Sequence, residues 1–337
     1  MSALLQNNPR LTPGGDHVES WFVRANDPHS PRALWIKATV LTSRDGTAIA
    51  QAWCSVFDGD RVKAWCADIP LADAVFDAGE KGQDLTVGPL RLQLNADGGC
   101  SRGALADASA RVEWGFEFAK TPIVGEPLSM LPTDRLLDAK FPGNKLVTPF
   151  PVAAVSGYLD WAGERWNLDG WHGMQGHNWG TAHSPEYAWG HCVFTDTNGG
   201  APFAVLEGAS GRTRLGSRVT PLLSMLVIRR GEEEYRFDRI LDLWRQRPRL
   251  DFPDWTLRMR GRDGTATLRM HGAPERMVCL AYRNPAAPTS YCLNSKTAAV
   301  SVHVEPINGN AFQLRSEHAG ALEFLTPQPH PAVRPIV

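Results

Sequence analysis

The chain has 337 residues, of which 43% are hydrophobic and 21% are charged, and its formal net charge is −1. This composition is that of a folded globular protein and excludes a disordered chain. Basic and acidic residues are interspersed, so we expect neither nucleic acid nor an anionic membrane surface as a partner, because both require a basic stripe. The length suits two domains of roughly 150 residues each.

The amino-terminal residues show no targeting signal. They lack the basic start and the apolar run of a secretory signal peptide, and no stretch of about 18 residues is apolar enough to span a membrane. The six cysteines form no CxxC pair, and several fall in predicted strands. We therefore expect a cytoplasmic protein whose thiols are reduced and mostly buried.

Almost every segment alternates apolar and polar residues with the period of two that is typical of β-strands. Residues 33–41 (ALWIKATVL) show it first along the chain. Turn residues predict hairpins at 58–60 (DGD), 162–163 (AG), 229–235 (RRGEEEY) and 263–264 (DG). Short strands at this spacing predict an all-β sandwich or barrel rather than βαβ units.

Residues 120–152 interrupt the strand pattern. Five prolines precede Phe150 in this segment, and only PTDRLLDAK within it suits a short helix. We place a domain boundary near residue 148, so that residues 1–148 and 149–337 each form an antiparallel barrel and the Pro/Gly-rich segment joins them. The alternative is a long loop within a single sandwich.

Residues 157–191 gather aromatic and imidazole side chains. Five of the twelve tryptophans lie between Trp161 and Trp189, and His172, His177, His183 and His191 lie close to them. These side chains have three interpretations: packing at the end of a barrel, a metal site, or a small-molecule site with apolar walls and a few polar groups. No spacing matches HExxH and no cysteine pair is present, so we predict no metal.

The run GWHGMQGHNWG at 170–180, followed by YAWG at 187–190, resembles the signature of the carotenoid 1,2-hydratase and AttH-like superfamily. Residues 19–40 (ESWFVRANDPHSPRALWIKATV) are similar to the opening strands of bacterial members of that group. The resemblance implies two consecutive lipocalin-like barrels, in agreement with the strand pattern. It also implies an alkene hydratase, a cyclising enzyme or a lipid-carrying protein.

The resemblance implies catalytic roles for His177 and Trp179 of the His-Asn-Trp motif. The hydratases also use a Tyr-x-Asp pair, which this chain lacks; the nearest equivalent is Val205-Leu206-Glu207. Glu207 is therefore the candidate acid, and Tyr187 supplies a phenol if its strand faces the same cavity. The residues expected to bind substrate are Trp171, His172, Asn178, Trp189 and His191.

We predict an enzyme that acts on a hydrophobic, isoprenoid- or polyketide-like small molecule. The reaction would be acid–base addition or cyclisation at a carbon–carbon double bond without a cofactor, as in a hydratase (a lyase) or a cyclase or isomerase. A buried Glu207 would keep its proton and deliver it, His177 would orient the acid or water, and Trp171 and Trp179 would face the substrate cation. The alternatives are a non-catalytic lipid or terpenoid carrier and a purely structural pair of filled barrels.

Outside this window, two features have structural interpretations. Glu19 and Arg24 are expected to form a buried pair that braces the barrel interface. Asp169 precedes a turn glycine and is expected to be a turn residue. The chain contains no GxSxG, P-loop or strand-bound GxGxxG motif, which argues against a serine hydrolase of the α/β type, an NTPase and a dinucleotide enzyme.

Overall fold

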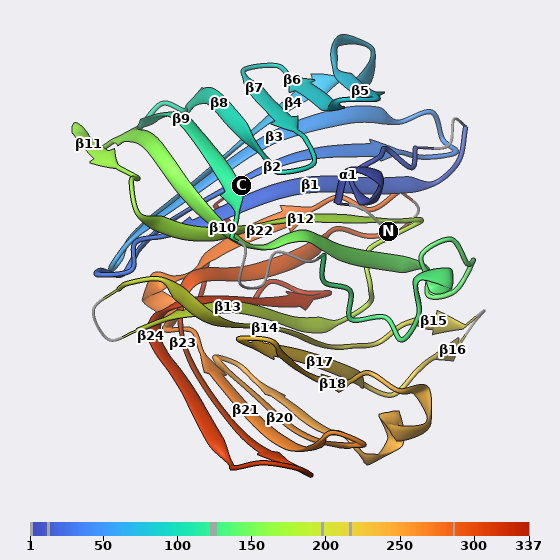
Figure 1. Cartoon of the computed structure of the whole chain (residues 1–337). Helices are drawn as coiled ribbons and strands as arrows, with labels where there is room; N and C mark the ends of the chain where they lie inside the picture. Colours follow the sequence, from blue (N-terminus) through green and yellow to red (C-terminus); the bar gives the residue numbers. More distant parts are fainter. Residues whose placement is uncertain are drawn as a thin grey trace.

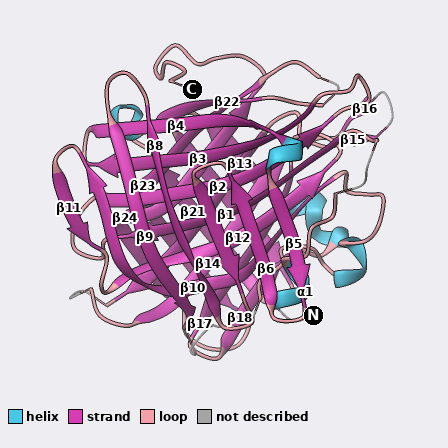
Figure 2. Ribbon diagram, turned by 90° about the horizontal axis from the view of Figure 1, so that it is seen from above, coloured by secondary structure: helices cyan, strands magenta, loops and turns pink. Residues whose placement is uncertain are grey.

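A computed structural model describes residues 3–11, 14–121, 127–196, 199–215, 218–285 and 287–336. Two large antiparallel sheets lie against each other, and each curls around a core of its own (Figure 1). The predicted all-β fold with two consecutive lipocalin-like barrels is confirmed, as the strand-dominated view from above also shows (Figure 2). In the described parts of the chain, no helix has the length and apolar character needed to cross a membrane.

The first sheet has twelve strands in the order β4-β3-β2-β1-β12-β10-β9-β8-β7-β6-β5, with β11 paired to β10. Its strands are β1 (His17–Asn26), β2 (Arg32–Thr42), β3 (Ala48–Asp58), β4 (Arg61–Pro70), β5 (Val75–Gly79), β6 (Gly82–Val87), β7 (Leu90–Leu94), β8 (Gly98–Ala106), β9 (Arg111–Lys120), β10 (Asn144–Trp161), β11 (Glu164–Asn167) and β12 (Trp171–Gly180).

The second sheet has ten strands in the order β18-β17-β14-β13-β24-β23-β21-β20-β19, with β22 paired to β23. Its strands are β13 (Tyr187–Thr195), β14 (Pro202–Gly211), β17 (Leu223–Arg230), β18 (Glu233–Phe237), β19 (Arg247–Asp251), β20 (Asp254–Gly261), β21 (Gly264–His271), β22 (Val278–Tyr282), β23 (Ser290–Pro306) and β24 (Phe312–Thr326). A separate pair consists of β15 (Arg214–Leu215) and β16 (Arg218–Val219).

Helices are short in the described residues. One turn of α-helix, α1 (Ala3–Gln6), lies at the start of the chain. The 3₁₀ segments are η1 (Leu71–Asp73), η2 (Asp134–Leu136), η3 (Ile240–Arg245) and η4 (Pro274–Arg276). The short helix predicted within PTDRLLDAK is therefore the three-residue η2.

The burial of the strands shows which part of each sheet faces the other barrel. Every residue of β1 is buried, because one face points into the first barrel and the other packs on the second sheet. In contrast, β9 alternates between buried and more exposed residues, because its outer face meets solvent. Residues 33–41, which the sequence analysis expected to alternate, are instead a near-continuous apolar run because β2 is buried on both faces.

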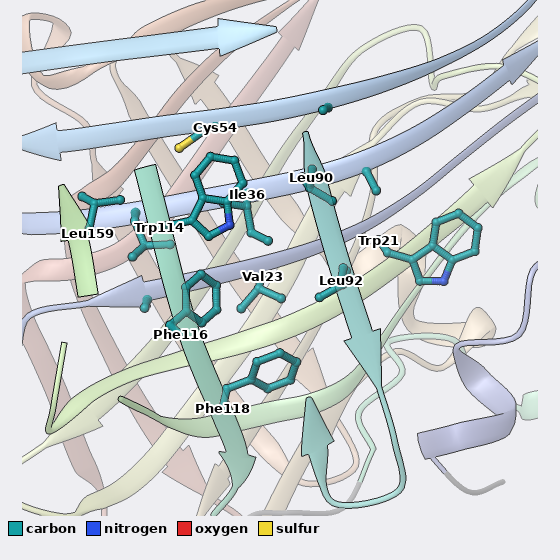
Figure 3. Close-up of a cluster of buried hydrophobic side chains, with 14 of the residues drawn as sticks. Trp21, Val23, Ile36, Cys54, Leu90, Leu92, Trp114, Phe116, Phe118 and Leu159 are labelled. Atoms are coloured by element: carbon teal, nitrogen blue, oxygen red, sulfur yellow. The ribbon is translucent and has the colours of Figure 1, made fainter. Parts of the chain in front are cut away.

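The three largest apolar clusters of the described residues hold this arrangement together. The first fills the first barrel and includes Trp21, Trp114 and Phe116 (Figure 3). The second fills the other barrel around Trp255 and Phe237. The third lies between the barrels and takes residues from both sheets, so the two barrels share a buried interface.

The chain passes from the first sheet to the second between Gly180 and Tyr187. The boundary that the sequence predicted near residue 148 falls inside β10, which pairs with β9 on one side and β12 on the other. The proline-rich segment therefore connects β9 to β10 of one sheet instead of joining the barrels. Leu128 and Met130 of this segment belong to the apolar cluster between the barrels.

The predicted hairpins are confirmed. Strand pairs turn after Asp58, Trp161, Arg230 and Gly261, as the register of each pair shows. Ala162 and Gly163 both have positive φ, at 54° and 80°, which is the backbone of a tight two-residue turn. Asp169 is a turn residue as predicted, since its carboxylate accepts a hydrogen bond from the Gly157 N–H.

Candidate active site between the two barrels

A cavity of about 290 Å³ lies where the two barrels meet. The first sheet contributes side chains from β1, β2 and β12, and the second contributes from β13, β14, β17, β22 and β24. Residues 130–146 and η3 complete the wall. Most of the wall is apolar, with Phe22, Trp35, Met130, Leu146, Trp189 and Met225 among its residues. Apolar walls with a few placed polar groups are the usual form of a small-molecule site.

The register of three strands brings polar groups to one spot on this wall. Trp189 of β13 lies opposite Glu323 of β24, and Glu323 lies opposite Asn294 of β23. Side chains at directly opposed positions project from the same face of a sheet. Glu323 is therefore surrounded by groups from its two neighbouring strands, on the face that meets the first barrel.

Glu323 is the centre of a hydrogen-bonded cluster. Its Oε1 accepts hydrogen bonds from Lys296 Nζ at 2.6 Å and from Asn294 Nδ2 at 3.0 Å. Its Oε2 lies 3.4 Å from the hydroxyl of Tyr187, which donates to it. Burial raises the pKa of Glu323, but the Lys296 and Lys37 ammonium groups outweigh burial and hold that pKa below its usual range. Glu323 is thus an ionised carboxylate with a phenol beside it.

A second lysine points into the same region without a carboxylate of its own. Lys37 is 5% exposed, and its Nζ lies 3.8 Å from the ring centre of Tyr282, 4.9 Å from that of Trp53 and 5.1 Å from that of Trp35. Burial lowers the pKa of Lys37 to about 8, with Glu323 acting in the opposite direction. Near neutral pH this group is still an ammonium ion.

The histidine, tyrosine and cysteine side chains near Lys37 and Glu323 are neutral near pH 7. His183 stacks on Tyr282 with ring centres 5.2 Å apart, and burial lowers the pKa of this imidazole to about 3. Burial also raises the pKa values of Tyr187, Tyr282 and Cys292 well above their ordinary values. Charge in the centre of the site therefore comes from Lys37, Lys296 and Glu323.

Three of the residues that the sequence selected lie in this cavity: Asn178, Tyr187 and Trp189. The expectation that Trp171, His177 and Trp179 line it together is wrong. These side chains share one face of β12, and that face points into the first barrel, where Trp171 joins the core and His177 stacks on Trp21 at 4.7 Å. Alternation puts them on the same face, but pairing with β1 and β10 determines which face is inside.

His177 belongs to a closed cluster inside the first barrel. Its Nε2 lies 2.8 Å from Glu19 Oε1 and its Nδ1 lies 2.6 Å from the Gln6 carbonyl oxygen. Both ring nitrogens of His177 therefore have a hydrogen-bond partner. Glu19 also receives hydrogen bonds from His17 and from the Arg10 N–H. This arrangement fastens the amino-terminal segment over the end of the barrel.

Glu19 and Arg24 do not form the predicted pair, because they point to opposite faces of β1. Arg24 instead donates to His191 Nδ1 at 2.9 Å and to the Ala319 carbonyl oxygen. Together with His172, Arg24 lines a separate cavity of about 50 Å³. His172 and His191 are therefore outside the wall of the larger cavity, although His191 stacks on Trp189.

Glu207 lies at the barrel interface but does not line the cavity. Its carboxyl oxygens are 2.9 Å from Thr148 Oγ1, and Trp189 Nε1 donates to Oε1 at 3.1 Å. Burial raises the pKa of Glu207 to about 7, as the sequence suggested for a buried acid. Glu207 contacts neither His177 nor Tyr187 through a hydrogen bond in the described structure, so it reaches the site only through the indole of Trp189.

A larger groove of about 990 Å³ lies along β5–β10 and is a weaker candidate. Two of its acidic residues pair with basic side chains outside the lining: Asp84 pairs with Arg91, and Asp97 pairs with Lys120. These side chains are substantially exposed, so water competes for their interactions. The inter-barrel cavity has the buried and unusually charged groups expected of a functional site.

Four residues of the site were missed in the sequence: Lys37, Tyr282, Lys296 and Glu323. One signal was present, since Lys37 interrupts the apolar run ALWIKATVL at the centre of a strand. A lysine at such a position is rare unless it has a partner or a function. Nothing in the local sequence of Glu323 indicates its role, because its partners lie on neighbouring strands.

No protein-family model matches the chain, and no curated protein matches it. Two solved structures are similar in fold. A putative AttH from Nitrosomonas europaea is 14% identical, with 92% of each chain covered and a TM-score of 0.55. Kievitone hydratase from Nectria haematococca is 12% identical, with 97% of this chain and 93% of that chain covered and a TM-score of 0.58. The chain therefore has the fold of these two proteins, and the resemblance to the AttH-like superfamily is confirmed as a resemblance of fold.

Proposed function

We propose that the protein is a hydratase-like enzyme that performs acid–base addition at a carbon–carbon double bond of an apolar small molecule. The observation that carries this proposal is the Tyr187–Glu323 pair on the apolar wall of the inter-barrel cavity, with Glu323 kept ionised by Lys296. The similarity in fold to kievitone hydratase supports the same class of reaction. An isoprenoid or polyketide skeleton would suit the walls.

The pair can perform both proton transfers that hydration needs. Glu323 takes a proton from water while the water oxygen bonds to one carbon and the π bond breaks. The Tyr187 hydroxyl gives a proton to the other carbon, and the proton on Glu323 then returns to the Tyr187 oxygen. Water thereby adds across the double bond, and both side chains recover their starting forms.

This assignment replaces Glu207 as the proton donor. The Glu207 carboxyl group is hydrogen-bonded to Thr148 and Trp189 and does not line the cavity. We propose that Glu207 is a positioning residue that holds the indole of Trp189 in place.

The Tyr187–Glu323 pair favours a double bond polarised by a conjugated carbonyl group, because the base is an ionised carboxylate and the donor is a phenol with a raised pKa.

The test is a panel of conjugated and isolated alkenes in ¹⁸O-labelled water, with products detected by the mass of one added water. We expect wild type to hydrate a conjugated member, and Glu323→Gln and Tyr187→Phe to lower turnover by about 10²–10⁴-fold, the usual contribution of general acid–base catalysis. Glu117→Gln, on the outer face of β9, is the matched control and should be fully active.

Two further readouts keep the result interpretable. Thermal melting shows whether Glu323→Gln is folded, and binding of an apolar ligand shows whether its cavity is intact. Unchanged turnover in both variants would contradict the assignment. If wild type binds members of the panel but hydrates none, the protein is a carrier of apolar molecules rather than an enzyme.

A further inference from the structure

Lys37 differs from the other charged groups around the inter-barrel cavity because its charge has no hydrogen-bonded partner in the described structure. Its ammonium contacts the rings of Tyr282, Trp53 and Trp35. In contrast, the ammonium of Lys296 donates a hydrogen bond to Glu323. Burying an ammonium group without a hydrogen-bond acceptor costs folding free energy. Such a group is therefore rare in proteins unless a ligand or a nearby negative charge interacts with it.

Each remaining charged side chain of the wall has an ion-pair or hydrogen-bond partner. Arg212 pairs with Glu186, Asp238 pairs with Arg236, and Lys145 donates to the Pro142 carbonyl oxygen. At the centre of the site, Lys37 and Lys296 carry two positive charges and Glu323 carries one negative charge. The centre of the site therefore has one positive charge in excess beside the apolar wall.

The excess positive charge disfavours binding of the substrate cation that the sequence analysis expected. The aromatic faces of Trp35, Trp53 and Tyr282 are already directed at Lys37, and those of Trp35 and Trp189 lie 5.0 and 5.5 Å from Lys296 Nζ. A carbocation in the same space would be repelled by two ammonium groups in a region of low dielectric. An anionic oxygen would instead supply the acceptor that Lys37 lacks.

We infer that the ligand of this cavity is an apolar organic acid whose anionic oxygen, a carboxylate, phenolate or enolate, binds Lys37 Nζ. The inference rests on the proposed function for the location of the site, but it applies equally to an enzyme and to a carrier. The apolar wall receives the hydrocarbon part of the ligand, and Lys37 fixes the orientation of its acidic end.

The test compares two probes of nearly the same size and shape, trans-cinnamate and trans-cinnamamide, which differ in charge. Binding is measured by calorimetry for wild type, Lys37→Met and Lys63→Met. Lys63 of β4 pairs with Asp107 outside the cavity, so its variant controls for the loss of one positive charge. We expect wild type and Lys63→Met to bind cinnamate at least about tenfold more tightly than the amide, and Lys37→Met to lose this preference.

A pH series on wild type gives the same test without a substitution. The groups that face Lys37 are Glu323, Lys296, Cys292, Cys66, Tyr282 and His183. The pKa of Glu323 lies below its ordinary value, that of His183 is lowered to about 3, and those of the phenol and the thiols are raised. The preference for cinnamate should therefore fall as the pH rises past about 8, where Lys37 loses its proton. The affinity for the amide should stay constant.

Equal affinities of wild type for the two probes would overturn the inference, as would a preference for cinnamate that survives in Lys37→Met. These outcomes are distinct from failure of the proposed function. Cinnamate bound through Lys37 without any turnover overturns the enzyme and keeps the acid site. Turnover of neutral alkenes that depends on Glu323, with no preference for cinnamate, overturns the acid site and keeps the enzyme.

Discussion

The first barrel and the cavity between the barrels both place buried titratable groups among tryptophans. In the first barrel, His177 and Glu19 lie against Trp21 and Trp179. In the cavity, Lys37 and Glu323 lie near Trp35 and Trp189. In composition the two places are alike. They differ in whether their polar groups are satisfied by the protein itself.

In the first barrel, the two titratable groups of this cluster have hydrogen-bonding partners within the protein. The carboxylate of Glu19 receives three hydrogen bonds, and both nitrogens of His177 have acceptors. In the cavity, the ammonium of Lys37 contacts aromatic faces and has no hydrogen-bond acceptor among the described residues. Buried polar groups that satisfy one another contribute to structure, whereas an unsatisfied group next to open space indicates a ligand. The predictions below test this contrast.

The largest effect on stability is expected from His177→Ala. The change leaves the buried carboxylate of Glu19 without its His177 partner, and breaking a buried pair in this way costs about 3–5 kcal/mol. Urea unfolding should show this loss, while cinnamate affinity at the inter-barrel cavity should change by less than about threefold. The matched control is His271→Ala, which removes an exposed pair with Asp254 and should cost under about 1 kcal/mol. Weakened ligand binding without a loss of stability would place His177 in the functional site after all.

Lys37→Met is expected to have a smaller effect on stability, and of opposite sign: the variant should be stabilised. Burial lowers the pKa of Lys37 from 10.5 to about 8, so between these pH values the unfolded chain binds more protons than the folded protein and stability rises with pH. At pH 7 the folded protein therefore bears the full cost of the buried ammonium, at most about 3 kcal/mol. The variant should be more stable than wild type at pH 7, and the gain should disappear as the pH approaches 10.5. A variant that is less stable than wild type at both pH values would mean that the aromatic contacts outweigh burial.

The smallest effect, in this case on turnover, is expected from Glu207→Gln. The amide keeps an oxygen that accepts from Trp189 Nε1, so the cavity wall should hold its shape and turnover should stay within about threefold of wild type. Steady-state kinetics on a hydrated member of the alkene panel would measure this. A loss of about 10²-fold or more with intact binding would restore Glu207 as the proton donor.

The sequence predicted the fold well because strand periodicity and turn residues are local signals. It also found Asn178, Tyr187 and Trp189, which lie in the motif segment and reach the cavity. It misplaced His177 and Trp179 because the face of β12 that lies inside the first barrel depends on pairing with distant strands. The requirement for glycine at Gly176 of the motif also depends on a neighbouring strand. A Cβ at this position would collide with the ring of Phe22 on β1.

Lys37, Lys296 and Glu323 could not be brought together from the sequence. Their meeting depends on the register of β23 and β24 and on the packing of β2 against the second sheet, which are long-range features. Single-sequence patterns show which residues share a strand face but not which strands meet across an interface. The unusual lysine within an apolar strand was the one local indication.

The most direct test of the central claim is ¹⁹F NMR of protein labelled with 5-fluorotryptophan, titrated with trans-cinnamate. The twelve tryptophans report on both barrels and on their interface, and Trp→Phe substitutions assign the signals. We predict that the signals of Trp35 and Trp189 shift with saturable binding, while those of Trp21, Trp171 and Trp179 do not move. Shifts confined to Trp21, Trp171 and Trp179 would place the ligand in the first barrel and contradict the assignment of the inter-barrel cavity as the functional site.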